Sequence, residues 1–423
     1  MAIYDIDWSK KHLVKISNEI FFNDEIEQAD WRKKIEPWLT AIFQSEHFSL
    51  LVGNGLTTAV TKMAGSDSQG MSRINFNEFS DKIKQWANDS ARNMDRGEAN
   101  FEDDLRTAME LLTGLQILHD NKAATLKTEI DTQLFGFIKN ILKTENCFYS
   151  SEKSIEASNY LKSFLISFAS RTATRDRLHI FTTNYDRFIE YGCDRTGIFT
   201  LDRFVGKLQP VFRASKLELN YHYNPPGIRG EPRYVEGVAR LTKLHGSIDW
   251  RFHNGQIVKA ALPFGACENH PDIPQNASDH VVIYPNSSKG IDTAFYPYAE
   301  LFRDFASAIC RPNSAVVAYG YGFGDSHINR ILKDMLSIPS THIVIISYNN
   351  TSGRIEKFYK DVNSAQMTLL IGEHFGDLKT LVDEYLPKAA IDRLTERMQK
   401  NKEKRGITEN DKRIDMKESG EIN

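Results

Sequence analysis

The stretch HFSLLVGNGLT, residues 47–57, decides the fold class of this sequence. Its first six residues are mostly apolar and are followed at once by Gly53-Asn54-Gly55. A short apolar run that ends in glycines is typical of a buried strand leading into a nucleotide-binding turn, where the backbone can approach a pyrophosphate. Position 58 is a threonine, so the third glycine of G-x-G-x-x-G is missing. Taken alone, this turn fits both a nucleotide site and an ordinary tight turn.

Further strand-like runs along the chain predict a doubly wound α/β fold. They lie at residues 178–183, 240–244, 281–284, 315–319 and 342–347. The last two flank an amphipathic helix whose apolar face is formed by Ile328, Ile331, Leu332, Met335 and Leu336. Strands that alternate with helices imply parallel βαβ units, and therefore a Rossmann-like, mostly parallel sheet.

The domain organisation is predicted from changes in pattern and composition. The mostly helical residues 66–175 form a large insertion after the first strand, and residues 8–46 are also expected to be helical and amphipathic. This divides the chain into an N-terminal helical segment (1–46) and a main domain (47–388). The remaining residues, 389–423, are expected to form a flexible or partner-dependent tail, because positions 390–423 hold nine Lys/Arg and eight Asp/Glu.

Composition argues against several classes of protein. The 53 basic and 56 acidic residues give a net charge of −3, so direct binding to nucleic acid or a membrane surface is not expected. No apolar run approaches the ~20 residues that span a bilayer, and the charged N-terminal stretch does not fit a secretory signal. The four cysteines form no C-x-x-C pair, which argues against disulfides and a thiolate zinc site. No G-x-x-x-x-G-K-[ST] loop for ATP occurs. We therefore expect a cytoplasmic protein without a metal site.

The sequence TTNYD, residues 182–186, ends another predicted strand, which is where open α/β sheets bind ligands. Asn184 cannot act as a base, but its side-chain donor and acceptor can orient a water or a ribose hydroxyl. Asp186 fits the cap of a helix that begins at Arg187 equally well. Both interpretations of this sequence stay open.

Two more polar sequences end predicted strands: LHGSIDW at residues 244–250 and GYGFGDSH at 320–327. A histidine can accept a proton near neutral pH, so His245 is a candidate base, with a hydrogen-bonded structural histidine as the alternative. The second sequence forms another glycine turn, in which Asp325 or Ser326 fits the N-cap of the next helix. Two glycine turns and two polar strand ends in one sheet indicate a ligand site.

In combination, these four sequences resemble the NAD-binding motifs of the sirtuin family, in the same order along the chain. The strings TTNYD, LHGSIDW and GYGFGDSH are similar to those of the bacterial sirtuin-like branch found in anti-phage defence. The resemblance spans about residues 47–350. It implies that residues 47–388 form a sirtuin-type catalytic domain and that NAD⁺ is its substrate.

The resemblance also implies a role for each residue of the motifs. Asn184 and His245 would be catalytic: Asn184 would position the nicotinamide ribose and a water, and His245 would act as the base. The pyrophosphate would be held by the first glycine turn, the carboxamide by Asp186, and the adenosine side by the second glycine turn. The residues expected to contact NAD⁺ are therefore Gly53, Asn54, Gly55, Thr57, Thr183, Asp186, Gly320, Gly322 and Asp325.

Departures from the family pattern bear on the reaction. Family deacylases carry four zinc cysteines in paired C-x-x-C motifs and a Pro-Asp-Phe-Arg string after the glycine turn, and this sequence has neither. Without an acyl-lysine, water becomes the acceptor, so the resemblance implies an NAD⁺ glycohydrolase that depletes NAD⁺ in abortive infection. The alternatives are a protein deacylase or ADP-ribosyltransferase on the same fold, and a non-catalytic sensor of NAD⁺ or ADP-ribose.

The expected partners follow from the length of the chain and its helical segments. In length and architecture the sequence resembles family members encoded beside a HerA-type hexameric ATPase, which would supply the missing phosphate loop. The amphipathic segments 8–46 and 66–175 offer more surface than one sheet can cover, which predicts a homo-oligomer. The alternative is a monomer whose helical insertion covers its own pocket.

Overall fold

A nine-stranded sheet forms the centre of the protein. The structure is a computed structural model that describes residues 6–22, 28–68, 73–93, 99–213, 220–224, 230, 233–274, 281–283 and 296–388. The strands from β16 to β5 run parallel, and β1 and β2 run antiparallel to their neighbours. In their order across the sheet, the strands are β2 (Glu19–Phe22), β1 (Leu13–Ile16), β16 (Met367–Ile371), β15 (His342–Ser347), β14 (Ser314–Tyr319), β3 (His47–Val52), β4 (His179–Thr182), β10 (Val238–Lys243) and β5 (Phe199–Leu201).

The direction in which successive strands are added across the sheet reverses beside β3. From β3 the chain moves outward through β4 to β10, then returns to β14 on the other side of β3 and moves outward again through β15 to β16. Open α/β sheets bind ligands at such a switch point, at the carboxyl ends of the strands. The mostly parallel, Rossmann-like sheet predicted from the sequence is therefore present, and its switch point lies between β3 and β14.

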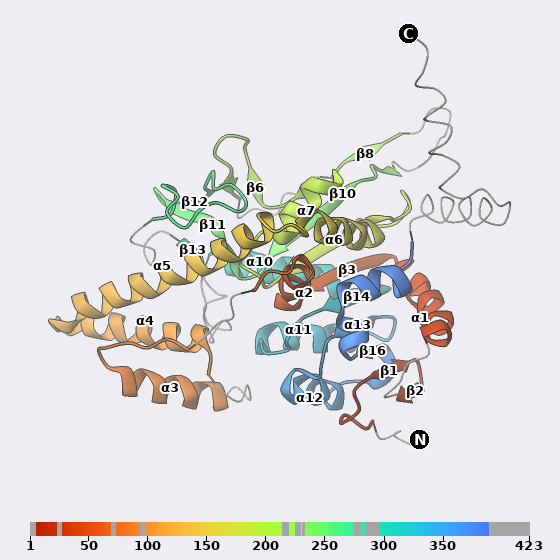
Figure 1. Cartoon of the computed structure of the whole chain (residues 1–423), viewed down its shortest axis with the longest axis horizontal. Coiled ribbons are helices and arrows are strands. Elements are labelled where there is room, and N and C mark those ends of the chain that lie inside the picture. Colours follow the sequence, from red (N-terminus) through yellow and green to blue (C-terminus); the bar gives the residue numbers. More distant parts are fainter. Residues whose placement is uncertain are drawn as a thin grey trace, which may run out of the picture.

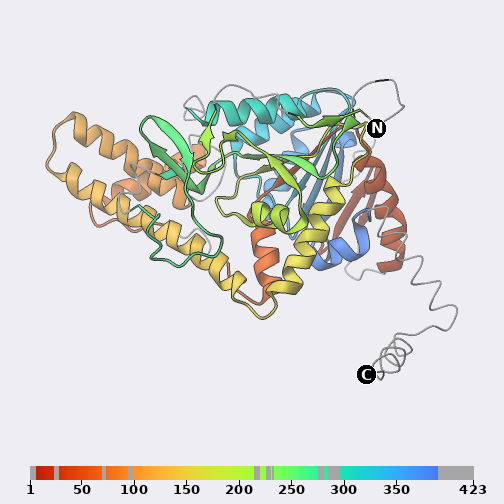
Figure 2. The ribbon, with the colours of Figure 1, turned by 90° about the horizontal axis from the view of Figure 1, so that it is seen from above.

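Helices cover both faces of this sheet, as the two views show (Figures 1 and 2). The first face carries α1 (Gln28–Phe43), α2 (Asn54–Ala64), α6 (Ser154–Ala169), α7 (Phe188–Thr196) and the short helices α13 (Glu373–Gly376) and α14 (Leu378–Thr380). The other face carries α10 (Tyr298–Ile309), α11 (Ser326–Leu336) and α12 (Arg354–Lys360). The predicted apolar face of α11 is buried at all five positions, and none of the described helices is long and apolar enough to cross a membrane.

The helical insertion divides into two parts. Helices α3 (Ser80–Asn93), α4 (Phe101–Ile117) and α5 (Lys122–Tyr149) extend away from the sheet, on the left of Figure 1. The side chains of α4 and α5 form their own apolar cluster, which also includes Tyr185 from the loop after β4 and Ile248 from the strand that follows β10. Helix α6 instead packs against the first face of the main sheet. The projecting helices are thus joined to the main domain directly beside the predicted site.

Smaller strands lie beside the main sheet. One group forms a second sheet in the order β13 (Val281–Ile283), β11 (Gly246–His253), β12 (Gln256–Lys259), β7 (Val211–Phe212) and β6 (Phe204–Val205). A separate pair joins β8 (His222–Tyr223) to β9 (Arg233–Tyr234). The run at 281–284 was expected in the parallel sheet, but β13 pairs antiparallel with β11 instead. A short apolar run carries no information about which sheet it joins.

The expectation of helix throughout residues 8–46 is wrong for its first part. Residues 13–22 form β1 and β2, and only α1 is helical as predicted. Leu13 and Val14 are both buried, because β1 lies between β16 and β2 in the sheet. Consecutive buried residues do not distinguish a strand covered on both faces from part of a helix. The predicted tail, 389–423, lies outside the described residues.

Candidate active site at the switch point

All four predicted motifs meet at one edge of the sheet. They follow β3, β4, β10 and β14, which are neighbours in the order β14-β3-β4-β10. Because these strands are parallel, their carboxyl ends lie together. The residues predicted to contact NAD⁺ therefore come from four adjacent loops, although nearly 270 positions separate the first motif from the last in the 423-residue chain. Two of these loops, at β3 and β14, flank the switch point itself.

The two glycine turns are packed against each other. Gly53 N donates to Tyr319 O at 3.1 Å, and Gly55 N donates to Gly320 O at 3.0 Å. A Cβ atom on Gly53 would lie 2.5 Å from Gly320 O, and one on Gly55 would lie 2.5 Å from Gly320 Cα. Gly320 itself has a φ of +61°, a conformation that side chains rarely adopt. The fold thus requires these glycines for the contact between the two turns, besides any approach to a ligand.

Asn184 lies at the centre of a buried network that joins the β3 and β4 loops. Its Nδ2 donates to Gly53 O at 3.1 Å and to Thr57 Oγ1 at 3.0 Å. The Thr57 hydroxyl donates in turn to Asp186 Oδ2 at 2.6 Å, and all three side chains are buried. Both amide hydrogens of Asn184 are therefore occupied, and the group that it offers to a ligand is the acceptor Oδ1.

Asp186 contacts both the first turn of α7 and the first turn of α2, which follows β3. Its Oδ1 accepts from Phe188 N at 3.2 Å, at the start of α7, while its Oδ2 binds the Thr57 hydroxyl. Lys243, at the end of β10, donates to the carbonyl oxygen of Asp186 and to Glu190 Oε1, the latter at 2.9 Å. The β4 loop is thus fixed from the β3 side, the β10 side and its own helix.

His245 pairs with Asp325 across the site. The imidazole Nε2 lies 2.9 Å from Asp325 Oδ2, and the two side chains are 6% and 10% exposed. The other carboxylate oxygen, Oδ1, accepts from His327 N and Ile328 N, so Asp325 is the N-cap of α11 as predicted. Asp325 therefore caps α11 with one carboxylate oxygen and orients the imidazole of His245 with the other. The family resemblance implies that His245 and Asp325 contact different parts of the ligand, and it does not predict their direct contact.

Two of the projecting helices, α4 and α5, contact the loop after β4. The Tyr185 hydroxyl donates to Glu102 Oε1 of α4 at 2.8 Å, and its ring lies 6.0 Å from the imidazole of His245. Burial raises the pKa of Tyr185, and the Glu102 carboxylate raises it further, so the hydroxyl remains a donor. Arg187 forms a buried ion pair with Glu145 of α5 at 2.6 Å. The sequence patterns predict no role for Tyr185 or Glu102: Tyr185 lies within TTNYD, whereas no local pattern marks Glu102.

Buried charges lie beneath the β10 loop. Burial would raise the pKa of the Asp249 carboxyl, but Lys243, Lys259 and Arg187 together hold that pKa below its ordinary value. Asp249 is thus held as an anion by the cations around it.

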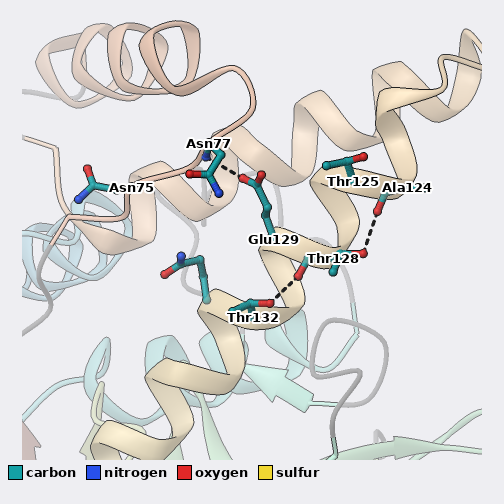
Figure 3. A pocket seen from close by; sticks show the side chains of 8 residues that line it. Asn75, Asn77, Ala124, Thr125, Thr128, Glu129 and Thr132 are labelled. Atoms are coloured by element: carbon teal, nitrogen blue, oxygen red, sulfur yellow. Dashed lines mark hydrogen bonds between the residues drawn. The ribbon is translucent and has the colours of Figure 1, made fainter.

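The hollow shown in Figure 3 lies on the projecting helices and is not part of the candidate active site. It has a volume of about 460 Å³ and lies between α5 and the segment before α3. Glu129 is its one charged lining residue, and the carboxylate accepts from the backbone N–H groups of Asn77 and Glu78. This hollow lacks the predicted site residues. The described residues also contain no group of three or more His, Cys, Asp or Glu side chains that could hold a metal ion.

A comparison with known families finds a match over part of the chain. Residues 178–366 match the family model of the SIR2-like domain. The match contains the loops after β4, β10 and β14, while the glycine turn after β3 precedes it. No curated protein matches the chain. SIR2-like domains use NAD⁺, so this similarity supports a sirtuin-like protein with NAD-related activity.

Proposed function

We propose that the chain is an NAD⁺ glycohydrolase. In this reaction the bond between nicotinamide and C1′ of the ribose breaks, a water oxygen bonds to C1′, and nicotinamide, ADP-ribose and a proton are released. The observation that carries the proposal is the meeting of Asn184, His245 and both glycine turns at the switch point, inside or beside a SIR2-like domain. A non-catalytic binding site would require neither a positioned amide oxygen nor an oriented imidazole.

Asn184 would orient the ribose or the attacking water. With its two N–H groups bound to Gly53 and Thr57, Oδ1 can accept a hydrogen bond from a hydroxyl or from water. The hydrogen bonds that hold the amide are buried, so its orientation is fixed before the ligand arrives. Such preorganisation of a reacting group contributes strongly to rate.

His245 would take the proton from the water or from a ribose hydroxyl. A neutral imidazole that donates from Nε2 to Asp325 carries its acceptor lone pair on Nδ1. The carboxylate also stabilises the imidazolium that forms when the proton is taken. The nicotinamide leaving group is neutral, so the step needs a positioned nucleophile and a modest base.

The proposed reaction can be separated from its alternatives by one assay. We expect the purified protein to release nicotinamide and ADP-ribose from NAD⁺ without any acetylated peptide, as measured by chromatography. Release that requires the peptide would identify a deacylase or ADP-ribosyltransferase. Binding of NAD⁺ without release, both with and without a HerA-type ATPase, would identify a sensor.

We further propose that this activity depletes NAD⁺ in an anti-phage response, as an abortive-infection effector. An active NAD⁺ hydrolase harms its own cell, so the resting protein must be restrained. We propose that its activity is controlled by assembly with copies of itself and with a HerA-type hexameric ATPase. A few kcal/mol of differential binding is enough to shift a protein between two states, and an ordinary interface can supply it.

The assembly is expected to involve the projecting helices. Ile117 ends α4 and Leu118 follows it; they are 72% and 77% exposed, and Trp86 on α3 is 62% exposed. Light scattering at micromolar concentration should therefore give a mass of at least twice the 48.3 kDa of one chain. Replacing both Ile117 and Leu118 with serine should lower that mass.

The matched control for this prediction is Leu208→Ser, because Leu208 is 98% exposed and lies outside the projecting helices. It should leave the mass unchanged. A single species of one chain that hydrolyses NAD⁺ at its full rate without any partner would contradict the proposed restraint by assembly.

A further inference from the structure

The second glycine turn, residues 320–325, alternates glycines with two buried aromatic residues. Tyr321 and Phe323 are 4% and 3% exposed, and their ring centroids lie 4.8 Å apart. Both rings belong to the apolar core on the α10–α12 face of the sheet, where the Phe323 ring lies 5.0 Å from that of Phe358 on α12. An added Cβ on Gly322, between them, would meet open space. The aromatic side chains thus anchor the turn in the core, and the glycine between them leaves its backbone open to a ligand.

The backbone of this turn is strained at Phe323. Its φ is +51°, in the left-handed region that residues with a Cβ atom rarely adopt. A bulky residue stays in such a conformation only where the surrounding structure fixes it, and residues of this kind cluster at functional sites. Contacts from a neighbouring element must therefore hold the turn in its present shape.

Asn329, on α11, supplies these contacts from one side chain. Its Nδ2 donates to the carbonyl oxygen of the strained residue, Phe323, at 3.0 Å. Its Oδ1 accepts from the Tyr321 hydroxyl at 3.0 Å. Burial raises the pKa of Tyr321, and the Asp325 carboxylate raises it further, so the hydroxyl keeps its hydrogen and donates it. Asn329 therefore holds the turn at two points, one on each side of Gly322.

The same helix also carries the contact between Asp325 and His245. Asn329 N donates to Asp325 O at 3.0 Å, and the Tyr321 hydroxyl lies 3.3 Å from that same oxygen. Asp325 caps the helix and contacts His245 through its own carboxylate, without the side chain of Asn329. Different side chains of α11 thus hold the glycine turn and the imidazole, so their effects can be separated by mutation.

We propose that Asn329 is a positioning residue that fixes the second glycine turn in the conformation that receives the adenosine side of the ligand. The inference rests on the proposed function and on the assignment of that side of NAD⁺ to Gly320 and Gly322. An amide suits this task because it donates and accepts at the same time, from different atoms. A turn that is already ordered binds its ligand without the cost of ordering it. Loss of the two hydrogen bonds should therefore weaken binding more than it slows the chemical step.

Isothermal titration of the full-length protein with ADP-ribose, which contains the adenosine and both phosphates of NAD⁺, tests the proposal. Asn329→Ala should weaken binding about 10-fold or more, as expected for the loss of two neutral hydrogen bonds. Asn329→Asp should also weaken it, because aspartate keeps the acceptor for Tyr321 but cannot donate to Phe323 O. Asn159→Ala, at an exposed position on α6, is the matched control and should leave the affinity unchanged. In the cleavage assay Asn329→Ala should raise KM and leave kcat nearly unchanged, a split that general destabilisation would not produce.

A second variant checks the contact itself. Tyr321→Phe removes only the hydroxyl, so it should cause a smaller loss of ADP-ribose affinity than Asn329→Ala does. The same change should have much less effect in the Asn329→Ala background, because the two side chains act through one hydrogen bond. Fully additive losses would contradict the contact.

Limited proteolysis with chymotrypsin, which cleaves after aromatic residues, tests the turn without any ligand. Cleavage after Tyr321 and Phe323, located by mass spectrometry, should be about 5-fold or more faster in Asn329→Ala, because each lost hydrogen bond favours local opening. Cleavage elsewhere should be unchanged, which shows that the fold is kept. Unchanged cleavage after both residues would overturn the proposal, as would faster cleavage with full ADP-ribose affinity. Faster cleavage in a protein whose wild type does not bind ADP-ribose would support the role of Asn329 in the turn and contradict the proposed function.

Discussion

Replacing His245 with alanine is expected to lower the rate of NAD⁺ cleavage by about 10²–10⁴-fold, the usual contribution of a positioned acid–base group. The imidazole is buried, oriented by Asp325 at 2.9 Å and located at the end of β10 beside the other three loops. Asn184→Ala should cause a loss of the same order, because it removes the acceptor that would orient the water or ribose. Nicotinamide release, measured at saturating NAD⁺, provides the readout.

Two further variants separate catalysis from structure. Asp325→Asn keeps a good N-cap for α11 but removes the carboxylate charge, so stability should be nearly unchanged while the rate falls about 10-fold or more. His253→Ala changes an exposed histidine on β11 and should affect neither property. If His245→Ala keeps most of the wild-type rate, then His245 is a structural residue and the base lies elsewhere.

The position of the site could be predicted from sequence because its signals are local. A buried strand followed by glycine, asparagine or histidine can be recognised within about ten residues. Parallel pairing then brings the strand ends together, so TTNYD and LHGSIDW fall beside each other without any knowledge of side-chain contacts. The same reasoning predicted α11, since its buried residues recur at helical spacing.

The contacts inside the site could not be predicted, because they join residues far apart in the chain. The Asn184 donors are bound by groups at positions 53 and 57, and His245 meets a carboxylate 80 residues later. Glu102 reaches Tyr185 only because α4 packs beside the β4 loop. No pattern within one helix or strand encodes such pairs. The same limit explains why the strand β1 was not predicted: its pairing partner, β16, lies more than 350 residues later in the chain.

Gly55→Ala is expected to destabilise the protein by about 1–3 kcal/mol, the usual cost of forcing extra atoms into a packed interior. The new Cβ would lie 2.5 Å from Gly320 Cα, a backbone atom that cannot rotate away, so the two glycine turns must separate. That separation would also move Gly53 O, which holds the amide of Asn184. We therefore expect NAD⁺ cleavage to fall at least about 10²-fold, comparable with the loss of a positioned catalytic group.

Three other glycines supply the controls for this prediction. Gly114→Ala and Gly136→Ala lie inside α4 and α5 with open space around the new Cβ, and each should stabilise the protein by about 0.5–1 kcal/mol. Gly322 also has open space, although it belongs to the second glycine turn. Gly322→Ala should therefore leave the denaturation midpoint unchanged and still weaken NAD⁺ binding, because its Cβ would occupy space that the ligand needs.

Equal stability of the Gly55→Ala and Gly114→Ala variants would contradict the contact between the turns. Unchanged NAD⁺ affinity in Gly322→Ala would place the ligand away from this loop, since the protein alone gives that position no reason to be glycine.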